Sequence, residues 1–241
     1  LHAGQTLDSE FGSRAQPIHQ TTSYVFTDTD TASSLFNLER GGHVYNRISN
    51  PTVGVLEQRV AALEGGSASV CVSSGMSAVF CALTALVSQG DHVVASANMY
   101  GGNISLLKNT LPRFGITATF VDPTDIKQIE SAIQENTKII FGELIGNPGL
   151  SVMDIEAVSK ICSKHHLPLM IDGTFNTPYL CRCFEYGANI IVHSLTKWMG
   201  GHGTSIGGVV VDGGNFDWGK DDKFPTLTEA YAPFTGINFW E

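Results

Sequence analysis

One lysine of the sequence lies in a setting that suits amine chemistry. Lys197 follows the apolar run "NIIVHS", which Ser194 closes, and stands directly after Thr196 and before the glycine-rich stretch "GGHGTSIGG". A lysine amine can form an imine with a carbonyl compound, and flanking hydroxyl groups can bind an anion. Most lysines simply lie in surface loops, and for Lys197 taken alone this interpretation stays open.

A second candidate stretch is Ser73-Ser74-Gly75-Met76, which follows the apolar run "ASVCV" and opens an apolar helical pattern. The start of a helix presents unpaired N–H groups and the positive end of the helix dipole, and a glycine there lets an anion approach the backbone. The stretch could therefore hold a phosphate. Ser-Gly before a helix is also an ordinary cap, so both interpretations remain.

Two further residues follow apolar runs. Tyr100 comes after "HVVAS" at the expected start of a loop, where an aromatic side chain more often packs than contacts a cofactor. Asp172 closes "LPLMID", and such a carboxylate either caps the next turn or meets a charged partner. Together with Lys197 and the Ser74–Met76 turn, these residues suit pyridoxal 5'-phosphate. That cofactor requires an amine, a carboxylate at its pyridine nitrogen and an anchor for its phosphate.

The elements that position these residues alternate between strand-like and helix-like periodicity. Apolar runs at 68–72, 92–96, 118–122, 138–144, 167–172 and 189–194 predict strands, and the patterns at 50–66, 76–87, 125–136 and 155–166 predict helices. Such alternation is typical of a mostly parallel sheet covered on both faces. Ligands of these sheets bind beyond the carboxyl ends of the strands, where the candidate residues are expected.

Composition narrows the function classes. Fourteen basic residues against twenty-three acidic ones give a net charge of −9 without a basic cluster, which argues against a nucleic-acid partner. No apolar run approaches the roughly 18 residues of a membrane helix. Five cysteines without a CxxC pair favour a reducing, cytoplasmic location, and no metal site is expected because His193 and His202 lack cysteine or carboxylate partners at ligand spacing.

Several longer motifs resemble a known family. The motifs are "QPIHQTTSYVF", "FNLERGGHVYNRISNPT", "VSSGMSA", "MYGG", "GNPG" and "TPYLCRCFEYGANIIVHSLTKWMGGHGTSIGG". They resemble the cystathionine γ-synthase group of Cys/Met-metabolism enzymes over nearly the whole chain. The resemblance implies a fold-type I pyridoxal-phosphate α/β fold with a mostly parallel seven-stranded sheet. It also implies an N-terminal arm (1–50) that reaches a neighbouring subunit and a large cofactor-binding domain (51–241).

The resemblance also implies roles for individual residues. Lys197 would be the Schiff-base lysine, and Asp172 would pair with the pyridine nitrogen. Tyr100 would stack on the ring, and Asn147 in "GNPG" would lie near the ring and the substrate carboxylate. The phosphate would be bound by residues of this chain and by a pair from the neighbouring subunit, and Thr174 would complete the cofactor contacts. The implied phosphate-binding residues are Ser74, Gly75, Met76, Ser194, Thr196, Tyr45 and Arg47.

The implied activity is γ-replacement on O-acetyl-L-homoserine with sulfide or methanethiol, by a homodimer or homotetramer. The segment "FNLERGG" favours this O-acetylhomoserine branch over methionine γ-lyase or cystathionine γ-synthase. The chain departs from the usual family pattern at Asn46 and Gly173, neither in a catalytic role. Because it lacks an initiator methionine and a closing element, we expect a longer protein with a second, smaller domain. A fragment that only folds and dimerises is the non-catalytic alternative.

Overall fold

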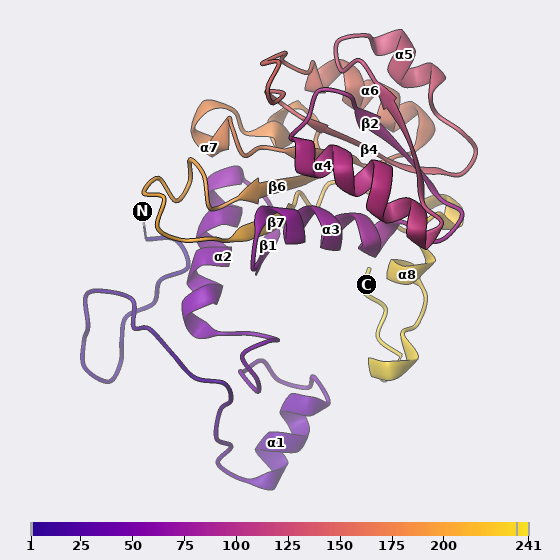
Figure 1. The fold of residues 1–241 in the computed structure, drawn as a ribbon. Coiled ribbons are helices and arrows are strands. Elements are labelled where there is room, and N and C mark those ends of the chain that lie inside the picture. The colour runs from indigo at the N-terminus through magenta and orange to yellow at the C-terminus, as the bar shows by residue number, and fades with distance from the viewer. Residues whose placement is uncertain (1, 235, 241) are drawn as a thin grey trace.

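The computed structural model describes residues 2–234 and 236–240 and contains a seven-stranded sheet in the order β1-β7-β6-β5-β4-β2-β3 (Figure 1). The strands are β1 (Ala68–Val72), β2 (His92–Ser96), β3 (Thr117–Val121), β4 (Thr137–Glu143), β5 (Leu169–Asp172), β6 (Ile190–Ser194) and β7 (Gly208–Asp212). Strand β7 is antiparallel to both of its neighbours, and the other pairings are parallel. The predicted mostly parallel seven-stranded sheet is confirmed; β7 is the strand that periodicity alone did not predict.

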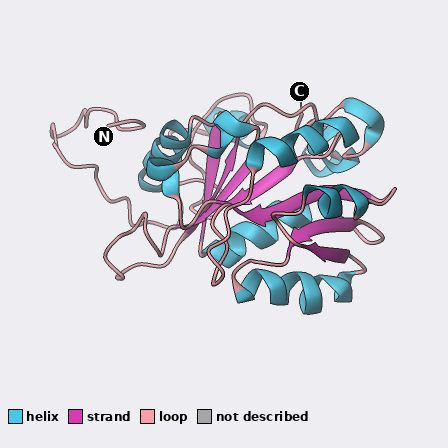
Figure 2. Ribbon diagram, turned by 90° about the horizontal axis from the view of Figure 1, so that it is seen from above, coloured by secondary structure: helices cyan, strands magenta, loops and turns pink. Residues whose placement is uncertain are grey.

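Helices cover both faces of this sheet (Figure 2). The α-helices are α1 (Thr29–Phe36), α2 (Pro51–Glu64), α3 (Gly75–Leu86), α4 (Gly101–Ser105), α5 (Ile126–Ser131), α6 (Ile155–His165), α7 (Thr177–Leu180) and α8 (Pro225–Thr228). Shorter turns of π or 3₁₀ type are η1 (Leu106–Thr110), η2 (Leu111–Phe114), η3 (Cys183–Tyr186), η4 (Lys220–Asp222) and η5 (Ala232–Phe234). All four predicted helices are present, although α5 ends at Ser131 and not near 136. None of the helices in the described ranges is both long and apolar enough to cross a membrane.

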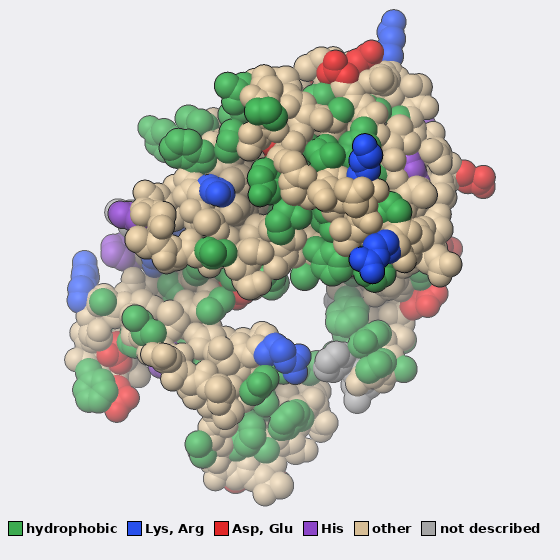
Figure 3. Space-filling model, viewed as in Figure 1, with side chains coloured by type: hydrophobic (Ala, Val, Ile, Leu, Met, Phe, Trp, Pro, Cys, Tyr) green, Lys and Arg blue, Asp and Glu red, His purple; other side chains and the backbone are tan. Residues whose placement is uncertain are grey.

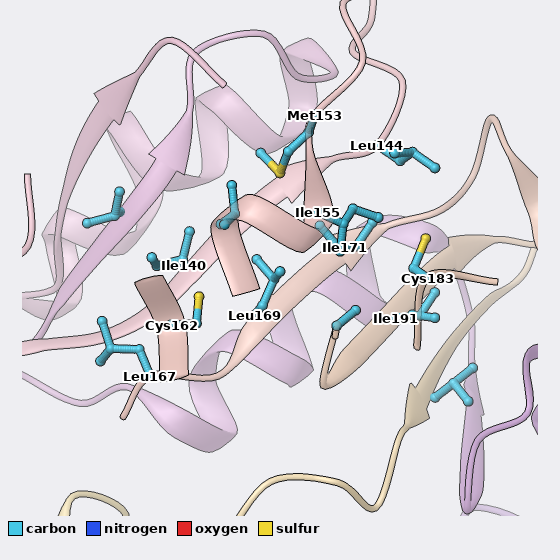
Figure 4. Close-up of a cluster of buried hydrophobic side chains, with 14 of the residues drawn as sticks. Ile140, Leu144, Met153, Ile155, Cys162, Leu167, Leu169, Ile171, Cys183 and Ile191 are labelled. Carbon is cyan, nitrogen blue, oxygen red and sulfur yellow. The ribbon is translucent and has the colours of Figure 1, made fainter. Parts of the chain in front are cut away.

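The strand alternation divides the core into two apolar clusters, one on each face. Ile140 of β4 packs with residues of α2, α5 and α6, whereas its neighbours Ile139 and Phe141 pack with α3 and η1 on the opposite face. Figure 4 shows the first cluster, with side chains of β4, β5 and β6 against α6. The central strands are therefore covered on both sides by apolar clusters.

Two apolar segments are less buried than the sequence suggests. Strand β1 was predicted to be buried, but Val70 is 60% exposed, because β1 lies at the edge of the sheet. Helix α2 begins at Pro51 and ends before a left-handed Gly65, as predicted. Of its periodic apolar residues only Val60 is buried, and Leu56 and Leu63 are more than 40% exposed. One apolar side of α2 is therefore only partly covered by the described residues.

The first residues of the chain lie against α2, where Arg59 donates a hydrogen bond to the carbonyl oxygen of Ala3, and most of the segment up to residue 50 then extends away from the layers of the sheet (Figures 1 and 2). Within this segment α1 lies farthest from the sheet, and an isolated bridge pairs Ser23 with Tyr45. Figure 3 shows hydrophobic side chains exposed on this segment and on the body of the molecule next to it. The division into an arm (1–50) and a cofactor-binding domain (51–241) stays a prediction, and residue 1 lies outside the described part.

Candidate functional site

A cavity of about 690 Å³ lies at the carboxyl ends of β4, β5 and β6. Ten of the twelve predicted site residues line it. They are Ser74, Gly75, Met76, Tyr100, Asn147, Asp172, Thr174, Ser194, Thr196 and Lys197. These ten residues come from five separate stretches of the sequence and are brought together, as expected for this edge of a parallel sheet.

The start of α3 forms one wall of the cavity. Ser74 caps the helix, since its Oγ accepts a hydrogen bond from the N–H of Ser77 at 3.1 Å. The amides of Gly75 and Met76 fall in the first helical turn, which has no acceptor inside the helix. A Cβ atom at Gly75 would lie 2.6 Å from Cβ of Ser194, so only glycine lets the helix start meet the end of β6. Free N–H groups and hydroxyls together form a site that suits a phosphate.

The loop after β6 carries Lys197 at the rim of the cavity. The hydroxyl of Thr196 accepts a hydrogen bond from the N–H of Gly207 at 3.1 Å and lies 3.3 Å from its carbonyl oxygen, which closes the base of the glycine-rich loop. Next to it, a Cβ atom at Gly208 would lie 2.0 Å from the carbonyl oxygen of Ser74. Lys197 is exposed, and within the described ranges its Nζ has neither a hydrogen bond nor an ion pair. Its amine is therefore open to a partner that enters the cavity.

Asp172 ends β5 and is held by hydrogen bonds, without a cationic partner among the described residues. Its Oδ1 accepts from the N–H of Thr174 at 3.0 Å and from the hydroxyl of the same residue at 2.6 Å. The Thr174 hydroxyl in turn accepts from the N–H of Ser194 at 2.9 Å, which links the ends of β5 and β6. The structure thus shows that Asp172 caps the next turn. A charged partner, the other interpretation that the sequence left open, stays a prediction.

Glu143 is a site residue that the sequence analysis missed. It ends β4 opposite Asp172, is 6% exposed, and accepts from the N–H groups of Tyr100 at 2.7 Å and Asn147 at 3.2 Å. The Nδ2 of Asn103 donates to it at 3.2 Å. Burial, and then the negative charge of Asp172, raises the pKa of Glu143 to about 7. A signal was available, because Glu143 is an acid that lies one residue before the end of the apolar run "KIIFGEL", close to the position that Asp172 has in its own run.

Tyr100 was predicted to lie at the start of a loop. In the structure it directly precedes the short helix α4. It is half exposed, and its ring lies beside Gly102 and Met76, since a Cβ atom at Gly102 would contact Tyr100 at 2.4 Å and Met76 at 2.9 Å. Other lining residues were not predicted: Asn103, Ile145, Phe175, Trp198, Gly201 and Gly203. No local pattern distinguishes these side chains, because only the folded chain brings them to the cavity.

Tyr45 and Arg47 are the two predicted site residues that do not line the cavity. Both lie in the N-terminal segment, where the Arg47 guanidinium is 5.5 Å from the centre of the Tyr45 ring. A contact with the phosphate of a neighbouring subunit stays a prediction for this pair.

A buried pair lies directly beneath the lysine loop. His193, on β6, and Glu64, at the end of α2, are both fully buried, and Nε2 of the histidine lies 2.5 Å from Oε1 of the glutamate. The sequence analysis found no carboxylate partner for His193 because Glu64 is 129 residues away in the chain. The pair ties α2 to the strand that leads to Lys197.

Comparisons with known proteins agree with this geometry. Residues 1–235 match the family of Cys/Met metabolism PLP-dependent enzymes. The chain belongs to this family. It is 49% identical to the O-acetyl-L-homoserine sulfhydrylase of Leptospira meyeri and to the homocysteine synthase of Schizosaccharomyces pombe, each over the whole chain. It covers 54% and 57% of those proteins, so it spans about half the length of the curated relatives it matches.

A solved structure of an O-acetylhomoserine (thiol)-lyase from Campylobacter jejuni superimposes with a TM-score of 0.95 at 38% identity. The match covers 99% of this chain and 59% of that one, and that structure contains a pyridoxyl-lysine phosphate. The predicted family, fold and cofactor are therefore confirmed. The residues of the cavity fit the cofactor: a lysine amine without a partner among the described residues, a strand-end carboxylate, and a helix start whose N–H groups lie beside hydroxyl side chains.

Proposed function

We propose that the protein catalyses γ-replacement on O-acetyl-L-homoserine, with sulfide or methanethiol as the incoming group and acetate as the leaving group. The products are homocysteine or methionine. The observation that carries the proposal is the convergence of Lys197, Asp172, Tyr100 and the start of α3 on one cavity. The sulfhydrylase and homocysteine synthase names of relatives at 49% identity support the choice of substrate.

When it is bound, pyridoxal phosphate withdraws electrons from the Cα atom of an amino acid. In the proposed mechanism the Nζ of Lys197 would hold the cofactor, and the same amine would take the proton from Cα and move a proton at Cβ. Asp172 would accept a hydrogen bond from the N–H of the pyridine ring and so favour the protonated ring. The ring of Tyr100 would pack against the cofactor. Asn147 lies on the loop after β4, where it can orient the ring and the substrate carboxylate.

The phosphate is assigned to the start of α3 and the end of β6, which meet at Gly75 and Ser194. We assign its donors to the amides of Gly75 and Met76 and to the hydroxyls of Ser74, Ser194 and Thr196. The hydroxyl of Thr196 already bonds to Gly207, so its contribution requires that it exchange this partner or donate while accepting from Gly207. Thr174 contributes through Asp172, whose Oδ1 it holds.

An assay of the full-length protein tests the substrate. O-acetylhomoserine, O-succinylhomoserine and methionine are supplied with and without sulfide, and the amino-acid, acetate and keto-acid products are measured. We expect sulfide-dependent release of acetate from O-acetylhomoserine. Formation of a keto acid from methionine without sulfide would favour a γ-lyase instead. A visible cofactor band and a borohydride adduct that survive in Lys197→Ala would refute the assignment of the lysine.

We further propose that the active form is at least a homodimer, and by resemblance a homotetramer, in the cytoplasm. The position of Arg47 outside the cavity and the exposed apolar side of α2 support a second copy. The five cysteines, all free in the structure, support a reducing compartment. The test mixes Arg47→Ala with Lys197→Ala, each inactive. A site shared between subunits restores about a quarter of wild-type activity in random hybrids, because half are mixed and each has one intact site. A site contained in one chain restores none.

A further inference from the structure

Two neighbouring strands end on acids that face the same cavity. Glu143 and Asp172 occupy paired positions at the ends of β4 and β5. Like charges at this separation repel, and neither carboxylate forms an ion pair with a lysine or arginine in the part of the chain that the structure describes. Some other group must keep the two side chains in place.

Asn103, on α4, is that group. Its Nδ2 lies 3.2 Å from Oε1 of Glu143 and 3.2 Å from Oδ2 of Asp172, so one amide spans both carboxylates. The side chain is 1% exposed, and its Oδ1 is buried without a hydrogen-bond partner. A flipped amide would direct an acceptor at two acceptors, so the carboxylates fix the orientation of the amide. The Nδ2 of Asn103 thus donates to both acids, while the Oδ1 of the same amide is left buried without a partner.

The two oxygens of Asp172 differ in their surroundings. Thr174 supplies two donors to Oδ1, whereas Asn103 is the donor to Oδ2 among the described residues. We propose that Asn103 is a positioning residue, which holds Oδ2 of Asp172 at the pyridine nitrogen of the cofactor while Glu143 holds Asn103. This inference rests on the proposed role of Asp172.

Glu143 is well placed for its part. It also accepts from the N–H of Tyr100, directly before α4, and from the N–H of Asn147 on the loop after β4. Helix α4 is thereby attached to the end of β4 at two points, its start and Asn103. Loss of the Asn103 amide removes the link to Asp172 but leaves the bond to Tyr100, so the change acts on Asp172 and not on the whole wall of the cavity.

The test compares three variants of the full-length protein: Asn103→Leu, which has similar size but no donor, Asp172→Asn, and the control Asn176→Leu. Asn176 is equally buried, its Nδ2 bonds to backbone carbonyls, its Oδ1 is also unpartnered, and it does not line the cavity. The readouts are the dissociation constant for pyridoxal phosphate and the ¹⁵N chemical shift of its labelled ring nitrogen. Neither readout depends on the amino-acid substrate.

We expect Asn103→Leu to weaken cofactor binding about tenfold, the loss of one hydrogen bond to a charged group, and to move the nitrogen signal toward neutral pyridine. Asn176→Leu should leave both values at those of the wild type. Should the leucine variant not fold, Asn103→Ser, too short to span both acids, is expected to change both values in the same direction. The inference is overturned if the dissociation constant and the ¹⁵N shift are unchanged in an Asn103 variant but both altered in Asp172→Asn. That result leaves the role of Asp172 intact. Unchanged values in Asp172→Asn refute that role, and the inference with it.

Discussion

Replacement of Glu143 by glutamine should change how the stability of the protein depends on pH. The pKa of Glu143 lies near 7 in the folded chain, against 4.5 ordinarily. The folded state therefore binds the proton more tightly, and the group favours folding fully below pH 4.5 and loses that contribution as the pH rises through 7. The difference between the two pKa values corresponds to roughly 3 kcal/mol of unfolding free energy. The value needs no reduction for solvent screening, because the side chain is almost fully buried.

The measurement is urea unfolding of the cofactor-free, full-length protein between pH 4.5 and 8, at one protein concentration. We subtract the unfolding free energy of the wild type from that of Glu143→Gln. This difference should rise by about 3 kcal/mol as the pH increases from 4.5 to 8, because glutamine does not titrate. Any constant cost of the amide cancels in the change with pH. Asp172→Asn should move the rise to lower pH, since it removes the neighbouring negative charge.

Glu130 offers a matched control. Its side chain is exposed, and hydrogen bonds from Lys164 and His165 hold its pKa below the ordinary value. Its contribution to stability is present above pH 4.5 and is lost only as the pH falls below that value. Glu130→Gln should therefore change much less with pH in the same window, and only through its contact with the titratable ring of His165. If the unfolding free energy of Glu143→Gln relative to the wild type changed as little with pH, burial and repulsion by Asp172 would not be the cause of the raised pKa of Glu143.

Two further predictions concern packing around the site. Gly75→Ala should weaken the binding of pyridoxal phosphate and lower the unfolding free energy by about 1–3 kcal/mol, because its new Cβ would lie 2.6 Å from Ser194; cofactor titration and urea unfolding measure the two effects. Glu64→Ala should cost roughly 3 kcal/mol of unfolding free energy, because it leaves His193 buried without its partner; a cost below that of an ordinary surface substitution in urea unfolding would contradict this.

The sequence predicted the part of the site that follows from local rules. An apolar run followed by an acid, a lysine or a capped helix start can be recognised within one short segment of the sequence. The residues found in this way, Asp172, Lys197 and Gly75, do meet in one cavity. The exposure of β1 could not be predicted in this way, because periodicity does not reveal that a strand lies at the edge of a sheet. The link between His193 and Glu64 depends on how α2 packs against β6, which no spacing along the chain records.

Glu143 is a different kind of omission, since it is an acid near the end of an apolar run, as Asp172 is, and the structure ends the strand on it. In a parallel sheet the carboxyl ends of adjacent strands lie only about 4.8 Å apart, so two strands that each close on an acid place like charges side by side. Register alone then requires a donor between them, and that donor must come from outside the two strands. Here it is Asn103, from the helix after β2. An acid at the end of one buried parallel strand is therefore best interpreted together with the residues that end its neighbours. Their number and charge determine whether the acid meets a cation, a bridging amide or a proton.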